Sequence, residues 1–246
     1  MGSQILSEVE KFEQYAHNWW NMQSAEFKLL HKINPLRIGF IQGVLKSHFA
    51  ACLENINSTK PLQGLKILDV GCGGGLATIA LNQLGASVIG IDPGKSAILA
   101  ANNKARDLGL QDIEHICIMP EDFKSSELFD VVVCLDVIEH VQSIEQTCAV
   151  LRNMVKLDGA IIISTINRNL KSLMLGIVAA EYLLRMLPVG THAYEKFVKP
   201  SQLQNILINS GFKIKKLQGI GLKLPYFEWG FIDDISVNYL AYFAAV

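Results

Sequence analysis

A glycine-rich loop beside a carboxylate is the feature of this sequence that most directly indicates chemistry. The loop spans residues 71–75 (GCGGG) and follows a short apolar segment that contains Asp69. Glycine lets a backbone turn tightly and lets a ligand approach the main chain. A nucleotide phosphate loop would need a Gly-Lys-Ser/Thr motif, and the strict G-x-G-x-x-G dinucleotide pattern fails at Leu76. Gly71 and Gly73 are therefore predicted to contact a ligand of another kind.

Two aspartates indicate which charge and which groups such a ligand should carry. Asp69 would repel a pyrophosphate, but it suits a cation such as the amino-acid end of S-adenosylmethionine. Asp92 ends the next apolar segment, where a carboxylate can accept hydrogen bonds from both hydroxyls of a ribose. Structural roles stay open, because Asp92 can cap the helix that follows and Asp69 can cap nearby backbone amides. The combination resembles the cofactor site of class I S-adenosylmethionine-dependent methyltransferases.

Three more titratable residues, Asp136, Glu139 and His140, follow the fourth apolar segment. Their i, i+3, i+4 spacing places them on one face of a helical turn, where two carboxylates and an imidazole can converge on a divalent cation. They can equally serve as general bases. A structural role stays open here too, since these side chains can simply cap the next helix.

The predicted elements would bring these residues to one edge of a sheet. Apolar segments at 66–70, 87–91, 113–118, 129–135 and 160–164 alternate with helical segments at 75–84, 96–108 and 144–156. Such alternation predicts parallel strands with helices on both faces and a ligand at the carboxyl ends of the strands. Two further strands, at 212–217 and 237–243, are expected to form an antiparallel pair. The predicted fold is therefore a Rossmann-like α/β fold with a mostly parallel, seven-stranded sheet.

The chain is predicted to have an N-terminal helical cap at 1–60 and a cofactor-binding domain at 61–246. Helical spacing of apolar residues indicates helices at 5–20 and at about 36–53. An insertion at 168–200 is expected after the fifth strand, because the alternation of strands and helices stops there.

The composition argues against several classes of protein. The 22 lysines and arginines nearly balance the 23 aspartates and glutamates, and the net charge of −1 argues against nucleic-acid binding. The 5 cysteines are scattered and form no C-x-x-C pair, which is typical of buried thiols in a reduced compartment. We find no targeting or membrane-spanning segment, so a cytoplasmic protein is expected. The mean hydropathy of +0.27 nevertheless favours contact with a membrane.

The segment 172–187 is the candidate for that contact. It is apolar except for Glu181 and Arg185, and its flanks are basic. A helix needs about twenty apolar residues to cross a bilayer, so this segment is too short to span one. An apolar helix with basic flanks is typical of a segment that lies in the membrane interface. A buried helix of the cap or a dimer contact is the alternative.

Several short motifs beyond the glycine loop resemble the ubiquinone-biosynthesis O-methyltransferases. The motifs are Trp19-Trp20, FKLLHKINPLR at 27–37, DVIEH at 136–140, STINRN at 164–169, EYLLRM at 181–186 and GTH at 190–192. The resemblance extends from about Phe12 to Tyr239. It implies S-adenosylmethionine as cofactor and transfer of its methyl group to a phenolic oxygen of a polyprenylated catechol or hydroxyphenol. It also implies peripheral association with the inner membrane and allows for a ubiquinone-synthesis complex as partner.

The same resemblance implies roles for individual residues of the cofactor site. Arg37 belongs to that site, where its guanidinium can pair with the methionine carboxylate. Leu135 matches a position that touches the cofactor. Met119 stands where many members of the superfamily bind the adenine amino group through an acid, so here the adenine is expected to stack on apolar side chains.

The resemblance further implies that Asp136, Glu139 and His140 bind Mg²⁺, as the matching set does in eukaryotic relatives. Asp136 replaces the usual glutamate, which shortens the reach of the side chain. A base or a bound cation would serve the reaction, because a phenol with a pKa of about 10 is mostly neutral at physiological pH.

Other functions stay open on the sequence alone. A methyltransferase of a soluble phenol would fit the same cofactor site, and so would a non-catalytic scaffold of a lipid-synthesis complex. A hydride-transferring dehydrogenase fits least well. Tyr226, Phe227 and Trp229 are candidates for the wall of an acceptor pocket, with an ordinary aromatic cluster as the alternative.

Overall fold

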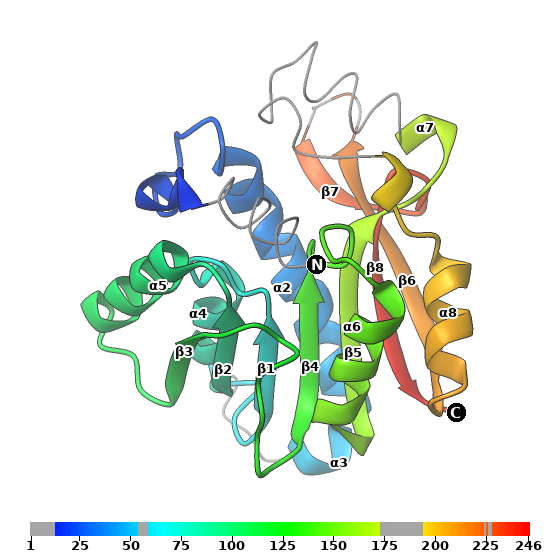
Figure 1. Cartoon of the computed structure of the whole chain (residues 1–246), viewed down its shortest axis with the longest axis horizontal. Helices are drawn as coiled ribbons and strands as arrows, with labels where there is room; N and C mark the ends of the chain where they lie inside the picture. Colours follow the sequence, from blue (N-terminus) through cyan, green and yellow to red (C-terminus); the bar gives the residue numbers. More distant parts are fainter. Residues whose placement is uncertain (1–12, 54–58, 173–193, 224, 226–227) are drawn as a thin grey trace.

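The computed structural model describes residues 13–53, 59–172, 194–223, 225 and 228–246, and its strands form one sheet (Figure 1). The order across this eight-stranded sheet is β3-β2-β1-β4-β5-β8-β6-β7. The strands are β1 (Lys66–Val70), β2 (Ser87–Asp92), β3 (Ile113–Cys117), β4 (Phe129–Leu135), β5 (Val155–Ile166), β6 (Phe212–Lys223), β7 (Glu228–Ile232) and β8 (Asn238–Ala245). Strands β1 to β5 pair in parallel, whereas β8, β6 and β7 are added as antiparallel neighbours. The predicted parallel sheet is confirmed.

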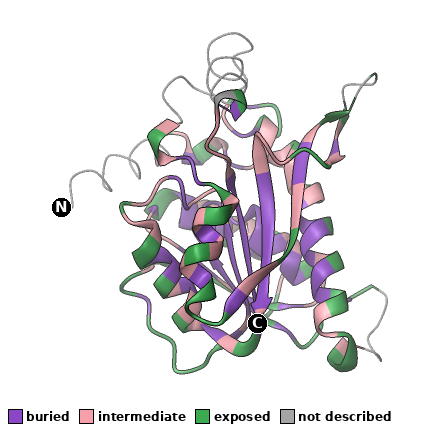
Figure 2. Ribbon diagram, turned by 90° about the vertical axis from the view of Figure 1, so that its right-hand side faces the viewer, coloured by how far each residue is buried: buried purple, intermediate pink, exposed green. Residues whose placement is uncertain are grey.

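Helices cover both faces of the sheet. The helical elements are η1 (Ala16–Asn18), α2 (Lys28–His48), α3 (Ala50–Leu53), α4 (Leu76–Gln83), α5 (Lys95–Asp107), α6 (Ile144–Met154), α7 (Leu170–Ser172), η3 (Tyr194–Lys196) and α8 (Pro200–Ile208). Helices α2 and α4 share one apolar cluster with the sheet, and α6 and α8 share the other. Figure 2 shows the resulting buried strands between partly exposed helices.

Strand β4 shows how the sequence builds the two layers. Val131 and Val133 pack into the cluster of α2 and α4, while Val132 and Cys134 pack into the cluster of α6 and α8. Successive side chains of a strand point to opposite faces, so a continuous apolar run is required where both faces are covered. All four side chains are fully buried.

The predicted number of seven strands is wrong, because β7 adds an eighth at the edge of the sheet. Most of β7 is only partly buried, since a single neighbouring strand pairs with it. An edge strand of five residues therefore has little of the alternation that identifies a half-buried strand. Strand β6 also continues six residues beyond the predicted end at 217, as far as Lys223.

The predicted start of the second helix is also wrong. Helix α2 begins at Lys28 and contains Pro35, whereas the sequence suggested a start at about residue 36. Proline favours the first turn of a helix and usually ends one elsewhere, so it is a misleading marker here. The longer helix buries Ile38, Ile41 and Leu45 against the sheet, which outweighs the one backbone hydrogen bond that proline cannot donate.

Some predictions fall outside the described residues. Of the predicted helix at 5–20, the structure describes residues 13–20, which include the short 3-10 helix η1 at Ala16–Asn18. Of the segment 172–187, only Ser172 is described, and Tyr226 and Phe227 also lie outside. Among the described helices, none is both long and apolar enough to cross a bilayer. The division into a cap at 1–60 and a domain at 61–246 stays a prediction.

Candidate cofactor and catalytic site

The glycine loop folds back over the end of the neighbouring strand. The backbone amides of Gly71 and Cys72 donate to the carbonyl oxygen of Ile91, at 2.8 and 3.1 Å. Gly71 has a φ of +75° and Gly73 a φ of +52°, which lie in the left-handed region that favours glycine. The loop thus needs glycine for its own conformation. Its hydrogen bonds to Ile91 hold its main chain at the carboxyl ends of β1 and β2.

Asp92 fixes the shape of this loop. One carboxylate oxygen accepts the backbone amide of Gly73 at 3.0 Å, and the other accepts the amide of Gly94 at 2.7 Å. Burial raises the pKa of Asp92, while these two amides lower it. Asp92 therefore has a structural role in holding this loop. The sequence allowed Asp92 to cap α5, but the residue that caps α5 is Gly94. The role of Asp92 in the loop does not exclude ribose binding, because each carboxylate oxygen can accept a second hydrogen bond.

Asp69 is a buried carboxylate beside the loop. It is 1% exposed, and its Oδ2 atom has no hydrogen-bond partner. Burial and the neighbouring Asp92 raise its pKa to about 7, although the backbone amide of Thr78 and the guanidinium of Arg37 lower it. A buried acceptor of this kind is costly unless a donor or a cation meets it. Asp69 is thus suited to a cationic ligand.

Arg37 reaches the same site from α2. Its Nη2 atom donates to the Oδ2 atom of Asp136 in an ion pair, although the two residues are 99 positions apart in the sequence. Burial lowers the pKa of Arg37 to about 10, and the charges of Glu139 and Asp69 raise it. The structure therefore brings Arg37 together with three carboxylates that the sequence places in two separate segments.

The side chains of Asp136 and Glu139 are held by the end of β5. The hydroxyl of Ser164 donates to Oδ1 of Asp136 at 2.6 Å, so both oxygens of this carboxylate are occupied. The hydroxyl of Thr165 donates to Oε2 of Glu139 at 2.8 Å. The other oxygen of Glu139 is buried and has no partner. Glu139 thus retains an acceptor that Asp136 has committed elsewhere.

This arrangement does not fit a magnesium site formed by Asp136, Glu139 and His140. Within the described residues, no three His, Cys, Asp or Glu side chains are grouped so that they can hold a metal ion. Asp136 is turned toward Arg37 instead, and its φ of 54° places it in a conformation that is uncommon for residues other than glycine. Residues 138–140 form a hydrogen-bonded turn and not the expected turn of helix, and His140 is half-buried.

The remaining predicted cofactor residues lie at the same edge of the sheet. Met119 follows β3 and is half-buried, and its carbonyl oxygen accepts the backbone amides of Asp122 and Phe123 at 3.0 and 3.2 Å. Leu135 ends β4 opposite Ser164 and is also half-buried. Except for Arg37, all the predicted site residues thus lie at or next to the carboxyl ends of four parallel strands, and Arg37 joins them through its ion pair with Asp136.

Sequence reasoning assigned no role to the segment that covers the glycine loop. The ring of Trp19 lies directly against Gly73 and Gly74, and the Nε1 atom of Trp20 donates to the carbonyl oxygen of Gly74 at 3.0 Å. The carboxylate of Glu13 accepts the amide and hydroxyl of Ser96, both at 2.7 Å. The Trp19-Trp20 pair was visible in the sequence, but only as part of a family motif.

Three of four buried side-chain atoms without a partner belong to this site. Among the described residues, the four atoms are Trp19 Nε1, Asp69 Oδ2, Glu139 Oε1 and Ser236 Oγ. Buried polar groups in folded proteins are nearly always hydrogen-bonded, so a cluster of exceptions calls for an explanation. The atoms comprise one neutral donor and two carboxylate acceptors, which is the set that a zwitterionic ligand with a hydroxyl-bearing partner would satisfy.

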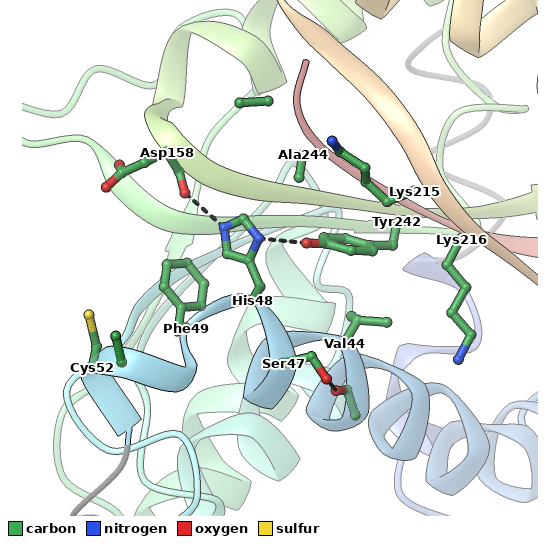
Figure 3. A pocket seen from close by; sticks show the side chains of 13 residues that line it. Val44, Ser47, His48, Phe49, Cys52, Asp158, Lys215, Lys216, Tyr242 and Ala244 are labelled. Carbon is green, nitrogen blue, oxygen red and sulfur yellow. Dashed lines mark hydrogen bonds between the residues drawn. The ribbon is translucent and has the colours of Figure 1, made fainter.

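A separate hollow of about 710 Å³ lies near the start of β5 (Figure 3). His48 lines it, with Nε2 at 2.8 Å from the carbonyl oxygen of Asp158 and Nδ1 at 2.6 Å from the hydroxyl of Tyr242. A carbonyl oxygen only accepts, so Nε2 donates to Asp158, and Nδ1 is hydrogen-bonded to the hydroxyl of Tyr242. The hollow lies at the amino end of β5, whereas the glycine loop and its carboxylates follow the carboxyl ends of the parallel strands.

Comparison with solved structures agrees with this fold. The magnesium protoporphyrin IX methyltransferase of Synechocystis PCC 6803, solved with bound S-adenosylhomocysteine, is 22% identical with a TM-score of 0.58, and the match covers 83% of each chain. The plantazolicin methyltransferase BpumL has a TM-score of 0.59 at 16% identity, over 100% of this chain and 99% of that one. Both likenesses show the fold alone.

Comparison of sequences is more specific. A family model described as a methyltransferase domain matches residues 42–217. The ubiquinone biosynthesis O-methyltransferase of Rickettsia canadensis (strain McKiel) is 41% identical over 242 residues, which cover 98% of both chains. The protein of the same name from Pelagibacter ubique is 39% identical over 243 residues, covering 99% of both chains. This chain therefore belongs to the ubiquinone-biosynthesis O-methyltransferase family of class I S-adenosylmethionine-dependent methyltransferases.

Proposed function

We propose that this protein transfers the methyl group of S-adenosylmethionine to a phenolic oxygen of a polyprenylated catechol or hydroxyphenol in ubiquinone biosynthesis. The names of its relatives support this substrate class. The observation that carries the proposal is the pair of buried carboxylates, Asp69 and Glu139, each with one oxygen that has no partner. One carboxylate can hold the cationic donor, and the other can accept the proton of the phenol.

Asp69 and Asp92 would hold the two polar parts of the cofactor. Asp69 would accept the ammonium group of the amino-acid end, which neutralises its buried charge. Asp92 would accept the ribose hydroxyls with the lone pairs that Gly73 and Gly94 leave free. Gly71 and Gly73 would let the cofactor lie against the main chain.

Arg37, Met119 and Leu135 would complete the cofactor site. A guanidinium has five N–H donors, so Arg37 can bind the methionine carboxylate while it remains paired with Asp136. Met119 and Leu135 would supply apolar contacts, with Met119 beside the adenine. This arrangement explains how a chain without an acid at position 119 can still bind the adenosyl group.

Glu139 is the best-placed base for the acceptor. When bound, the cofactor supplies a methyl group on a sulfonium, and the sulfur keeps the electron pair of the broken S–C bond. Glu139 would take the phenolic proton on Oε1 as the oxygen forms its bond to the methyl carbon. The hydroxyl of Thr165 occupies Oε2 and so leaves Oε1 as the acceptor. Asp136 is less suited to this role, because its carboxylate is ion-paired with Arg37 and each of its oxygens already has a protein donor, whereas Oε1 of Glu139 has none.

The geometry does not fit the magnesium site that the family resemblance implies for Asp136, Glu139 and His140, and a chelator tests this disagreement directly. Activity that is lost in EDTA and restored by Mg²⁺ would support the metal site. Full activity in EDTA would remove it and leave Glu139 as the base. The mechanism above requires no step on a metal.

We further infer that the enzyme works at the cytoplasmic surface of the inner membrane. A polyprenyl tail is insoluble in water, and the apolar segment 172–187 with its basic flanks is suited to the membrane interface. Co-sedimentation with anionic liposomes should be lost when Leu173 and Ile177 are both replaced by Glu. Retained binding by this variant would contradict the membrane role of the segment.

The decisive experiment is methyl transfer from labelled S-adenosylmethionine to two catechols, one with a short prenyl tail and one without a tail. We expect the label on a phenolic oxygen, with the higher kcat/KM for the prenylated acceptor. Equal kcat/KM values would favour a soluble phenol as the substrate. Tight binding of S-adenosylmethionine without transfer to either catechol would contradict the proposed activity.

A further inference from the structure

We propose that the indole N–H of Trp19 is a hydrogen-bond donor to the carboxylate of the S-adenosylmethionine amino-acid end. This inference rests on the cofactor site proposed above and adds a residue to it. The starting observation is that Trp19 Nε1 is a buried donor without a hydrogen-bond partner in the described structure. The residue is only 8% exposed, and its ring lies against the loop that would carry the cofactor.

The position of the ring follows from its contacts with the loop. A Cβ atom added at Gly74 would overlap Cγ and Cδ1 of Trp19, and a Cβ added at Gly73 would overlap Cζ2 and Cη2. Atom Nε1 is bonded to Cδ1 and Cε2, and both of these atoms are among those nearest the added Cβ positions, so the N–H of the indole lies beside the two glycines. The absence of two side chains at 73 and 74 is what makes room for the indole.

The ring also packs against neighbouring residues on its other side, and its buried N–H does not face water. The ring centroid of Phe27 lies 4.4 Å from that of Trp19. The carbonyl oxygen of Trp19 accepts Nε2 of His31 at 2.8 Å, and the neighbouring Trp20 donates to Gly74. A buried donor that has no partner destabilises the folded protein. A chain that fixes such a donor beside a ligand site can recover this loss of stability when the ligand binds.

The carboxylate is the cofactor group that best matches this donor. Helix α4 begins at Leu76, directly after the loop, and the N-terminus of a helix favours an anion. The carboxylate is the anionic group of the cofactor amino-acid end, and it is one carbon away from the ammonium that Asp69 would accept. The ribose hydroxyls are assigned to Asp92, and Arg37 would be a second donor to the same carboxylate.

The variant Trp19→Phe tests this inference, because it keeps an aromatic ring but removes the N–H. We expect the Kd for S-adenosylhomocysteine to rise roughly tenfold or more, as for the loss of a hydrogen bond to a charged group. The melting temperature of the Trp19→Phe protein without ligand should not fall through the loss of a hydrogen bond, because the N–H of Trp19 has no partner in the described structure. Trp20→Phe is the matched control: it loses the bond to Gly74 and should melt at a lower temperature.

A ligand that lacks the amino-acid end identifies the acceptor. 5′-Methylthioadenosine keeps the adenine and the ribose, so Trp19→Phe should leave its Kd unchanged. An unchanged Kd for S-adenosylhomocysteine, or equal weakening of both ligands, would overturn the inference. Failure of the wild-type protein to bind S-adenosylhomocysteine would instead overturn the proposed function.

A second measurement applies if Trp19→Phe is itself unstable. The 3 tryptophans give three indole N–H signals in a ¹H–¹⁵N spectrum of the wild-type protein. We expect the Trp19 signal to shift downfield and exchange more slowly with S-adenosylhomocysteine, but not with 5′-methylthioadenosine. A signal that responds to neither ligand, or equally to both, would contradict the inference.

Discussion

Lowering the pH should weaken the binding of S-adenosylhomocysteine, because Asp69 takes up a proton in the free protein. Burial and Asp92 raise the pKa of Asp69 to about 7 in the protein without a ligand, even though the guanidinium of Arg37 lowers it. An ammonium group bound at Oδ2 favours the charged carboxylate and must lower this pKa. The ligand therefore binds the deprotonated form, and each proton that Asp69 holds has to be released first.

The size of this effect follows from the pKa. With a pKa of about 7, Asp69 is about three-quarters ionised at pH 7.5 and about 3% ionised at pH 5.5. The apparent Kd should then rise about 25-fold between these two pH values, which corresponds to about 2 kcal/mol. The direction is fixed by the sign of the shift: the pKa is raised in the free protein, so affinity is lost as the pH falls.

Calorimetric titrations at pH 7.5, 6.5 and 5.5 would measure this dependence. 5′-Methylthioadenosine is the control, because it lacks the ammonium but still uses Asp92, whose pKa burial also raises. The variant Asp69→Asn should bind S-adenosylhomocysteine weakly and with little dependence on pH. A Kd that changes less than threefold from pH 7.5 to 5.5, or a variant that keeps the wild-type dependence, would refute the reasoning.

Three further predictions test other parts of the site and fold. Gly73→Ala should lower the free energy of unfolding in urea by about 2 kcal/mol and should also weaken the binding of S-adenosylhomocysteine. Gly109→Ala is the control: its φ is also positive, but the space around it is open, so it should lose about 1 kcal/mol of stability and keep its affinity. In steady-state kinetics, Glu139→Gln should lower kcat about a hundredfold or more, with the Kd for S-adenosylhomocysteine nearly unchanged; wild-type kcat would exclude Glu139 as the base. Tyr242→Phe removes the hydroxyl that is hydrogen-bonded to His48 and should lower the free energy of unfolding by about 1 kcal/mol without changing the rate of methyl transfer. A lower rate of methyl transfer in this variant would link the distant hollow to catalysis.

The local elements were predictable because short-range patterns determine them. Strands β1 to β4 lie within one residue of their predicted bounds, since each is a compact apolar run between glycine or polar breakers, whereas β5 begins five residues before its predicted start at 160. Asp69 and Asp92 could be placed for the same reason, as each lies at or next to the end of such a strand. Edge strand β7 could not be predicted, because a partly buried strand lacks a clear apolar pattern. The start of α2 could not be predicted either, because Pro35 indicates a helix start seven residues after the true one at Lys28.

Contacts between distant segments could not be read from local patterns. The ion pair of Arg37 with Asp136 depends on α2 crossing the sheet near the end of β4. It changes the expected chemistry, because it commits Asp136 to a protein partner and leaves Glu139 with the open acceptor. The contact of Trp19 with the glycine loop likewise joins residues more than fifty positions apart.

A crystal structure with S-adenosylhomocysteine tests the central claim most directly. We expect the ammonium nitrogen within hydrogen-bond distance of the Asp69 carboxylate, the ribose hydroxyls on Asp92, and the main chain of Gly71 and Gly73 against the ligand. A ligand bound elsewhere, or one whose ammonium lies away from Asp69, would contradict the account.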